Sequence, residues 1–164
     1  MKRLNYSVNN IDGLIKYLED YSKSIETKGE LFVRRLAEIG LPVIDATVAS
    51  TKGDADTGYN KSYIEVEGNT ARLIFEGNDV LFIEFGAGVH YNGEAGKSPH
   101  PKGAEFGYTI GSYGEGHGKQ DSWFYRDETG SLWRSFGTEA SMPMYKAAME
   151  IVTNIRRIAN EVFG

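Results

Sequence analysis

The chain has 164 residues, and its net charge of −5, from 18 basic and 23 acidic residues, argues against a dedicated nucleic-acid-binding protein, which would carry a basic surface. It contains no cysteine, so disulfide bonds and thiolate metal sites are excluded. No apolar run approaches the roughly eighteen residues of a membrane span, and the N-terminus lacks the apolar core of a signal peptide, so we expect a soluble intracellular protein with a single domain, residues 1–164.

Residues 1–50 are predicted to form a helical region. Apolar residues recur at helical spacing in a first helix, which is expected to end near residues 27–29. These apolar residues are Ile11, Leu14, Ile15, Leu18 and Ile25. A second helical pattern follows, and Gly40 and Pro42 interrupt it. The sequence leaves open whether residues 30–49 form one kinked helix or two.

Residues 60–85 are predicted to hold the first strands. Polar and apolar residues alternate over 63–67, a Gly-Asn turn follows, and 71–75 reads as a second strand, which together indicate a β-hairpin. Residues 80–85 are almost all apolar, with Glu84 as the single polar residue. Such a run is typical of a buried central strand, so we expect a third strand there.

Residues 86–122 form the most unusual segment of the chain, with half of its 20 glycines and all three histidines. A segment of this kind is rare inside a small domain and cannot bury enough apolar surface to order itself. Its aromatic residues favour a contact arm over a plain linker, because tyrosine is enriched at interfaces. We expect the arm to become ordered against another copy of the chain or a partner. The candidate contact residues in the arm and at its border are Tyr91, Pro99, His100, Phe106, Tyr108, Tyr113 and Trp123.

Two further strands are expected within residues 123–137, and residues 142–163 are predicted to form a C-terminal helix with Pro143 in its first turn. Helices followed by strands and then a helix indicate an α+β fold. We predict an antiparallel sheet of about four to six strands, with the N-terminal helices and the C-terminal helix packed on one face and the long arm extending from the sheet.

The residues give little support for catalysis, a metal site or a cofactor, and we expect none of the three. His90, His100 and His117 are too far apart in the sequence for a compact zinc motif. A metal site assembled by folding of the loop, with Glu94 or Glu115 as a fourth ligand, stays open. With such a site the chain would be a small metal-dependent hydrolase that uses the loop histidines, and this is the alternative function from a different class.

Six segments, taken in order, carry a resemblance to a known family. They are Phe32–Glu38, Asp56–Tyr63, Val80–Gly88 with its Glu-Phe-Gly-Ala-Gly end, Ser98–Pro101, Trp123–Tyr125, and Gly137–Ala148 at the entry to the last helix. In their order and spacing they resemble the neck proteins of long-tailed bacteriophages, which include tail-completion proteins, head–tail connectors and minor tail components. The family usually has leucine where Tyr59 or Asn60 stands, and phenylalanine more often than a residue such as Met144.

The resemblance implies a structural virion protein without catalytic residues, located at the head–tail junction after assembly in the host cytoplasm. It implies a ring of identical chains, a hexamer because the tail is sixfold, in which each subunit has two different contact surfaces. The implied partners are the tail terminator, the tail tube and the head-closure connector proteins, with DNA only as passing cargo and no membrane. A tail terminator that caps the tail tube is the alternative within this class.

Overall fold

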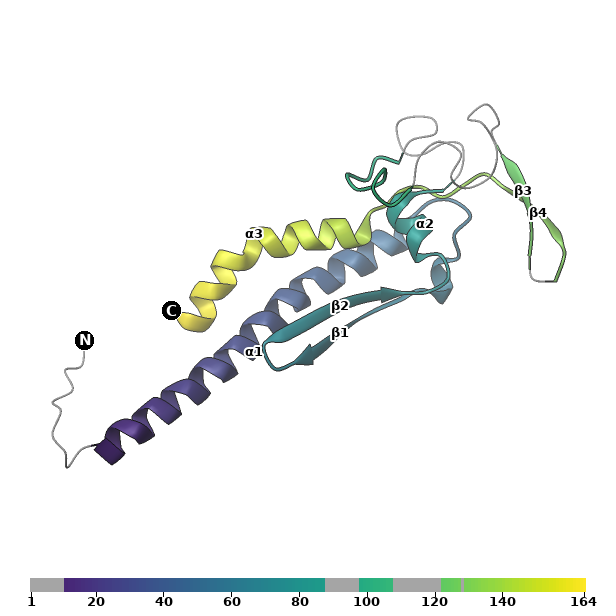
Figure 1. Ribbon diagram of the computed structural model, residues 1–164. Coiled ribbons are helices and arrows are strands. Elements are labelled where there is room, and N and C mark those ends of the chain that lie inside the picture. Colours follow the sequence, from purple (N-terminus) through teal and green to yellow (C-terminus); the bar gives the residue numbers. More distant parts are fainter. Residues whose placement is uncertain (1–10, 88–97, 108–121, 128) are drawn as a thin grey trace.

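The computed structural model describes residues 11–87, 98–107, 122–127 and 129–164. Figure 1 shows long helices at both ends of the chain and two hairpins and a short helix between them. The elements in chain order are α1 (Ile11–Ala49), the 3₁₀ helix η2 (Thr57–Tyr59), β1 (Lys61–Glu67), β2 (Thr70–Glu76), α2 (Val80–Phe85), β3 (Trp123–Arg126), β4 (Leu132–Ser135) and α3 (Pro143–Phe163). The predicted mixture of helices and antiparallel strands is confirmed.

α1 is one helix of 39 residues, so the predicted helix end near residues 27–29 is wrong. Gly29 lies inside the helix, next to Asn69 in the turn between β1 and β2. A Cβ atom on Gly29 would lie 2.4 Å from the Asn69 Oδ1 atom. The glycine therefore makes room for the Asn69 side chain and does not mark the end of a helix.

Residues 30–49 all belong to one helix, the second half of α1, although Gly40 and Pro42 lie within this stretch. Pro42 lacks the N–H group that would bond within the helix. Gly40 is buried beneath the side chains of Leu73 from β2 and Ile151 from α3. Packing on both sides stabilises this stretch as a helix where local propensity would interrupt it.

β1 and β2 form the predicted hairpin, which lies along α1 (Figure 1). Lys61 and Glu76 lie directly opposite each other, with 2.7 Å between the Lys61 Nζ and Glu76 Oε1 atoms. The Tyr63 hydroxyl donates a hydrogen bond to the other Glu76 oxygen at 2.9 Å. The bonds from Lys61 and Tyr63 lower the pKa of Glu76 from its usual value, and the bond to Glu76 raises the pKa of Tyr63.

Val80–Phe85 forms the short helix α2, so the predicted third strand is wrong. The N–H of Ile83 bonds to the carbonyl of Asp79 at 2.9 Å, and the N–H of Gly86 bonds to the carbonyl of Phe82 at 2.8 Å. The last three residues of α2 are buried. A short apolar run that is covered on several sides has no periodicity that separates a helix from a strand.

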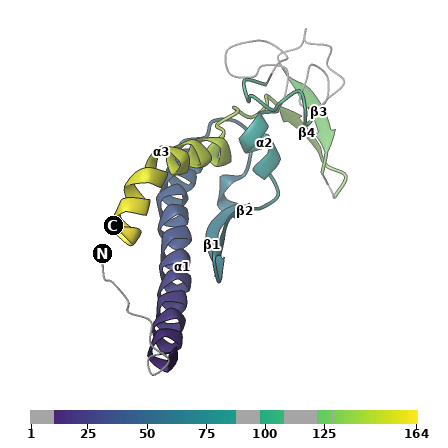
Figure 2. The same ribbon diagram turned by 60° about the vertical axis from the view of Figure 1, so that its left-hand side comes forward.

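The described residues contain two separate two-stranded sheets, β1–β2 and β3–β4. The predicted single sheet of about four to six strands with helices on one face is therefore not what these residues form. The helical conformation of α2 removes the strand that would have continued the first sheet. β3 and β4 confirm the two short strands expected in this part of the chain, and their hairpin projects away from the long helices (Figures 1 and 2).

α3 confirms the predicted C-terminal helix and packs along the second half of α1 (Figure 2). Near its C-terminus the Phe163 ring lies 5.6 Å from the Phe32 ring, and Arg35 forms an ion pair of 3.2 Å with Glu161. The largest fully buried side chains are Ile44, Ile83 and Pro143. They come from α1, α2 and α3, so the core lies where these three helices meet.

The segment that leads into α3 is held by backbone hydrogen bonds on both sides. Thr138 exchanges two bonds with Ala87, at 2.8 and 2.9 Å, directly after α2. The N–H of Asp54 bonds to the carbonyl of Gly137 at 3.0 Å, from the loop after α1. This segment therefore links the end of α1, the end of α2 and the start of α3.

Candidate functional site

Part of the predicted arm, residues 98–107, packs against α2 of its own chain. The Ser98 hydroxyl donates a hydrogen bond to the carbonyl of Phe85. The Phe85 ring lies 4.4 Å from the His100 ring and 5.4 Å from the Phe106 ring. The expectation that the arm takes its order only from another molecule is therefore wrong for this part of it.

Glu84 connects this loop to the start of α3. Its Oε1 atom lies 3.1 Å from His100 Nε2 and accepts the Tyr145 N–H at 2.9 Å, while its Oε2 atom accepts the Met144 N–H at 2.8 Å. N–H groups in the first turn of a helix have no partner within that helix. Met142, at the cap position, has a left-handed φ of 57° and supplies no side-chain bond. Glu84 therefore caps α3 from another element, where the helix dipole favours a negative charge.

The hydrogen bonds of His100 fix its tautomer. The Nδ1 atom accepts the backbone N–H of Lys102 at 3.0 Å, and a backbone amide nitrogen can only donate. Nδ1 therefore carries no proton, and Nε2–H donates to Glu84. The His100 side chain is buried, with only 8% of the residue exposed. The loop, the carboxylate and the helix thus form one buried polar connection, in which each bond stabilises the others.

This arrangement leaves neither ring nitrogen of His100 for a metal ion. Across the described ranges, no three histidine, aspartate or glutamate side chains lie close enough together to hold one. The remaining members of the open metal site, His90, His117, Glu94 and Glu115, lie outside the described residues. His100 gives the alternative hydrolase no support.

The acidic residues of the loop after α1 bind backbone and hydroxyl groups nearby. Asp54 Oδ2 accepts the Ser135 hydroxyl at 2.8 Å and the Phe136 N–H at 2.5 Å. Asp56 Oδ1 accepts the Gly58 N–H at 2.9 Å and begins η2. Each carboxylate therefore holds a different part of the chain.

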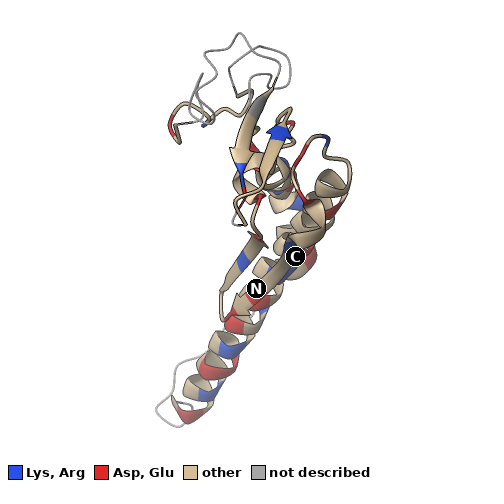
Figure 3. Cartoon of the chain, turned by 90° about the vertical axis from the view of Figure 1, so that its right-hand side faces the viewer, with Lys and Arg blue, Asp and Glu red and all other residues tan. Residues whose placement is uncertain are grey.

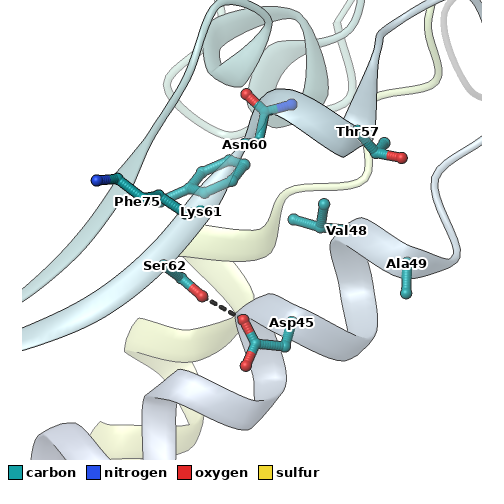
Figure 4. A pocket seen from close by; sticks show the side chains of 8 residues that line it. All are labelled: Asp45, Val48, Ala49, Thr57, Asn60, Lys61, Ser62 and Phe75. Carbon is teal, nitrogen blue, oxygen red and sulfur yellow. Dashed lines mark hydrogen bonds between the residues drawn. The ribbon is translucent and has the colours of Figure 1, made fainter.

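An open pocket of about 300 Å³ lies between the end of α1 and the start of β1 (Figure 4). Asp45 and Ser62 point toward one another, and the Ser62 hydroxyl donates a hydrogen bond to the Asp45 carboxylate. The lining residues are Asp45, Val48, Ala49, Thr57, Asn60, Lys61, Ser62 and Phe75. A serine nucleophile is usually activated by a base that a third group orients, and this lining contains no histidine. The pocket therefore lacks the arrangement of a hydrolytic site.

The β3–β4 hairpin presents apolar side chains on both of its faces. Phe124, Leu132 and Trp133 are 63%, 59% and 54% exposed. Phe124 pairs with Arg134, and Tyr125 pairs with Trp133. Neighbouring residues along a strand point to opposite faces, so exposed apolar residues lie on both faces of the hairpin. Two strands alone are only marginally stable in water, which makes this hairpin a candidate surface for contact with another protein.

Asp127 organises the turn of this hairpin. Its Oδ1 atom accepts the Thr129 hydroxyl at 2.6 Å and the N–H groups of Thr129 and Ser131, each at 2.9 Å. Its Oδ2 atom accepts the Trp133 indole N–H at 2.7 Å. The bonds from Thr129 and then Trp133 hold the pKa of Asp127 below its usual value. The turn therefore fixes the orientation of an exposed tryptophan.

The first half of α1 carries a second uncovered surface, the α1 stripe, which we define by Ile11, Leu18, Tyr21 and Ile25. These four residues are between 42% and 57% exposed. This half of the helix extends beyond both α3 and the β1–β2 hairpin (Figures 1 and 2). Figure 3 shows acidic and basic residues interspersed along it. The periodic apolar pattern predicted from the sequence is thus present on the surface, where it covers no core of its own chain.

α3 carries a third uncovered surface on the side that faces away from α1. The residues that pack inward are Ala147, Ile158 and Val162, which are all buried. The outer face of α3, which we define by Tyr145, Met149 and Val152, is 36% to 61% exposed, and at its N-terminal end the Tyr145 ring also contacts the His100 ring, with 5.4 Å between the ring centroids. A helix that is apolar on two opposite faces is normally covered on both.

The predicted contact residues fall into different environments. Pro99 is exposed, His100 is buried, and Phe106 is exposed although its ring contacts Phe85. Trp123 begins β3 on the projecting hairpin. The other three, Tyr91, Tyr108 and Tyr113, lie outside the described residues.

Two features of the site were missed from the sequence. The pattern of residues 80–85 predicts Glu84 only as the polar residue of a strand, yet a lone carboxylate within an apolar run signals a buried group that needs partners. The second apolar face of α3 was also not predicted from the sequence. The spread of the apolar residues around the helix was the signal that could have shown a second face.

Comparisons with protein-family models, with curated proteins and with solved structures found no match. Within the described ranges, none of the helices combines the length and the apolar character needed to cross a membrane.

Proposed function

We propose that this chain is a structural virion protein of a long-tailed bacteriophage, a neck or tail-completion protein at the head–tail junction. Identical chains form a ring, a hexamer that matches the sixfold tail, and the ring connects the tail to the head. Its partners are the tail tube, the tail terminator or the head-closure connector proteins. DNA passes through the ring as cargo, the protein assembles in the host cytoplasm, and it has no enzymatic activity.

The observation that carries this proposal is the set of three uncovered apolar surfaces in the described residues: the α1 stripe, the outer face of α3 and the β3–β4 hairpin. Large exposed apolar areas on a folded chain mark sites of contact with other molecules. A ring subunit needs two different surfaces for its two neighbours, and a third surface is available for a partner above or below the ring.

A contact between two segments of the family resemblance also supports the proposal. Val80–Gly88 and Gly137–Ala148 are far apart in the sequence, and they meet where Glu84 caps α3. The glutamate of the first segment accepts N–H groups that the second segment leaves unpaired. The capping of α3 by Glu84 therefore joins two of the residue patterns that carry the resemblance.

A tail terminator that caps the tail tube is the alternative within the same class, because it too would form a ring from these surfaces. The metal-dependent hydrolase is less favoured, because both ring nitrogens of His100 are used by Glu84 and Lys102.

Electron microscopy tests the proposal, on the purified protein and on tailed particles from cells that express the chain with its neighbouring genes. We expect sixfold rings of the purified protein and labelling of the head–tail junction by an antibody against the chain. Label at the upper end of tails that lack heads would favour the terminator. A chain that stays monomeric and is absent from the particles contradicts the proposal, and stoichiometric zinc in the purified protein would favour the hydrolase.

A further inference from the structure

We propose that the α1 stripe of one copy of the chain packs against the outer face of α3 in the next copy. This inference rests on the proposed function and deepens it by assigning the two surfaces that join neighbouring subunits.

The α1 stripe continues an interface that already exists within the chain. Its residues Ile11, Leu18 and Ile25 are seven positions apart, and the next member of this series is Phe32. Phe32 is covered by Phe163 at the end of α3, with 5.6 Å between the rings. α3 does not extend past this point toward the N-terminus of α1, and there the same line of apolar residues is exposed. A helix of this length is stabilised mainly by packing of its apolar face, so another helix is expected to continue the cover.

The outer face of α3 fits this position in length. At about 1.5 Å per residue, the α1 stripe from Ile11 to Ile25 is about 21 Å long. The part of α3 from Tyr145 to Arg156 is about 17 Å long by the same measure. The inner face of α3 already packs on α1 of its own chain. α3 would then lie between two α1 helices, with an apolar face toward each.

Acidic residues border the α1 stripe, among the basic residues of this half of the helix, and a cation lies on the outer side of α3. An acidic row borders the α1 stripe, each member following directly after one of its apolar residues: Asp12, Glu19 and Glu26. Arg156 lies on the outer side of α3, one helical turn beyond Val152, and is exposed. It forms no ion pair with any other described residue. Docking of the two surfaces would bring this cation near the acidic row, which favours the pairing over one between like charges.

The alternative pairing, α1 with α1, is symmetric and joins two copies only. It would leave the outer face of α3 uncovered. The pairing of α1 with α3 uses a different surface on each partner, so every copy can both offer a stripe and receive one. Contacts of this type pass from copy to copy and close into a ring when the rotation allows.

Cysteine cross-linking tests the inference cleanly, because the chain contains no cysteine of its own. Leu18→Cys is placed in one copy and Val152→Cys in a second copy that carries a size tag, and the two are co-expressed and oxidised. The mixed disulfide-linked dimer is expected to be the main product. Lys16→Cys is the matched control, because a step of two residues places it on the opposite side of α1. It should lower the yield of the mixed product at least about five-fold.

Two outcomes would overturn the inference. A Leu18→Cys homodimer in excess over the mixed product would assign α1 to a symmetric pair. Equal yields from Leu18→Cys and Lys16→Cys would mean that the cross-links arise from random collisions. Both substituted positions are exposed, so loss of folding is not expected to obscure the result.

A single chain with both Leu18→Cys and Val152→Cys separates this inference from the proposed function. The inference predicts a ladder of linked copies, and a hexamer would end the ladder at the sixth step. A ladder that ends elsewhere supports the α1–α3 contact and contradicts the sixfold ring. Rings that are visible by electron microscopy but give no ladder overturn the contact and leave the proposed function standing.

Discussion

Glu84 and His100 are joined by a hydrogen bond of 3.1 Å, and the same Glu84 carboxylate accepts two N–H groups of α3. One buried side chain therefore connects α2, the loop 98–107 and the start of the C-terminal helix. Removal of either side chain should therefore destabilise elements that are far apart in the sequence.

Replacement of Glu84 by glutamine should destabilise the chain. The amide has one oxygen where the carboxylate has two, so the N–H groups of Met144 and Tyr145 cannot both keep their present acceptors. We expect the free energy of unfolding to fall by about 2 kcal/mol, as measured by urea denaturation. Glu105→Gln, at an exposed position in the nearby loop, is the control and should change it by less than about 0.5 kcal/mol. Equal effects of the two variants would contradict the capping role.

Replacement of His100 by alanine should release the loop 98–107. The variant loses the bond to Glu84 and the ring contact with Phe85. We expect trypsin to cleave after Lys102 roughly ten-fold faster than in the unaltered chain, because local opening exposes the bond. Cleavage products identified by mass spectrometry give the measurement. If the rate does not change, the loop is held by contacts other than those of His100.

Replacement of Gly53 by alanine should cause a steric clash, and Gly107 is the control for the effect of backbone conformation alone. Gly53 and Gly107 both have positive φ, at 126° and 79°. A Cβ atom on Gly53 would lie 2.5 Å from the Gly137 carbonyl oxygen, whereas a Cβ atom on Gly107 meets nothing within 4 Å. Gly53→Ala should therefore lower the free energy of unfolding by about 3 kcal/mol or more, and Gly107→Ala by about 1 kcal/mol. Similar losses of unfolding free energy in the two variants would mean that backbone conformation, and not the clash, is the cause.

The β3–β4 turn should loosen in acid. The pKa of Asp127 lies below its ordinary value of 3.8, chiefly because the Thr129 hydroxyl and the Trp133 indole bond to the carboxylate. The contribution of these bonds is complete above the ordinary pKa and is lost as the pH falls through the folded pKa. The NMR signal of the Trp133 indole N–H should therefore shift with a midpoint below pH 3.8. Asp127→Asn should abolish this titration, and a midpoint above the ordinary value would contradict the bonding.

Charge reversal at Arg156 should weaken the contact proposed between copies. Arg156→Glu places a like charge near the acidic row of α1. The yield of the mixed Leu18→Cys and Val152→Cys product should fall roughly two- to five-fold at low salt, with a smaller effect at high salt. Glu19→Arg in the copy that supplies α1 should restore the yield. If it does not, the acidic row is not the partner of Arg156.

Local patterns in the sequence were sufficient to predict several elements. The alternating residues on either side of Gly68 predicted the β1–β2 hairpin, and Pro143 followed by a helical repeat predicted α3. These elements could be predicted because the local preferences of neighbouring residues favour the same secondary structure that the fold contains. The helical stripe beginning at Ile11 was also predicted, but periodicity alone does not say whether a face is covered by the same chain or by another.

Elements that depend on distant contacts were not predicted. Gly29 looked like a helix end, and only its closeness to Asn69 explains a glycine within α1. Val80–Phe85 looked like a strand, because a short run that is buried on several sides carries no period. The role of Glu84 depends on residues some sixty positions further along the chain, at the start of α3. No local pattern could indicate that contact.

The uninterrupted course of α1 has a consequence for spacing. A helix of 39 residues is about 58 Å long and resists stretching, so the distance from its free tip to the core is set by residue count. In the proposed ring, the length of α1 would set the distance between the core and the point where the tip contacts another copy. Insertion of seven residues in its free half would lengthen the reach by about 10 Å and turn the tip by only about 20°. The dimensions of any larger structure built from this chain would then follow from the number of turns in one helix.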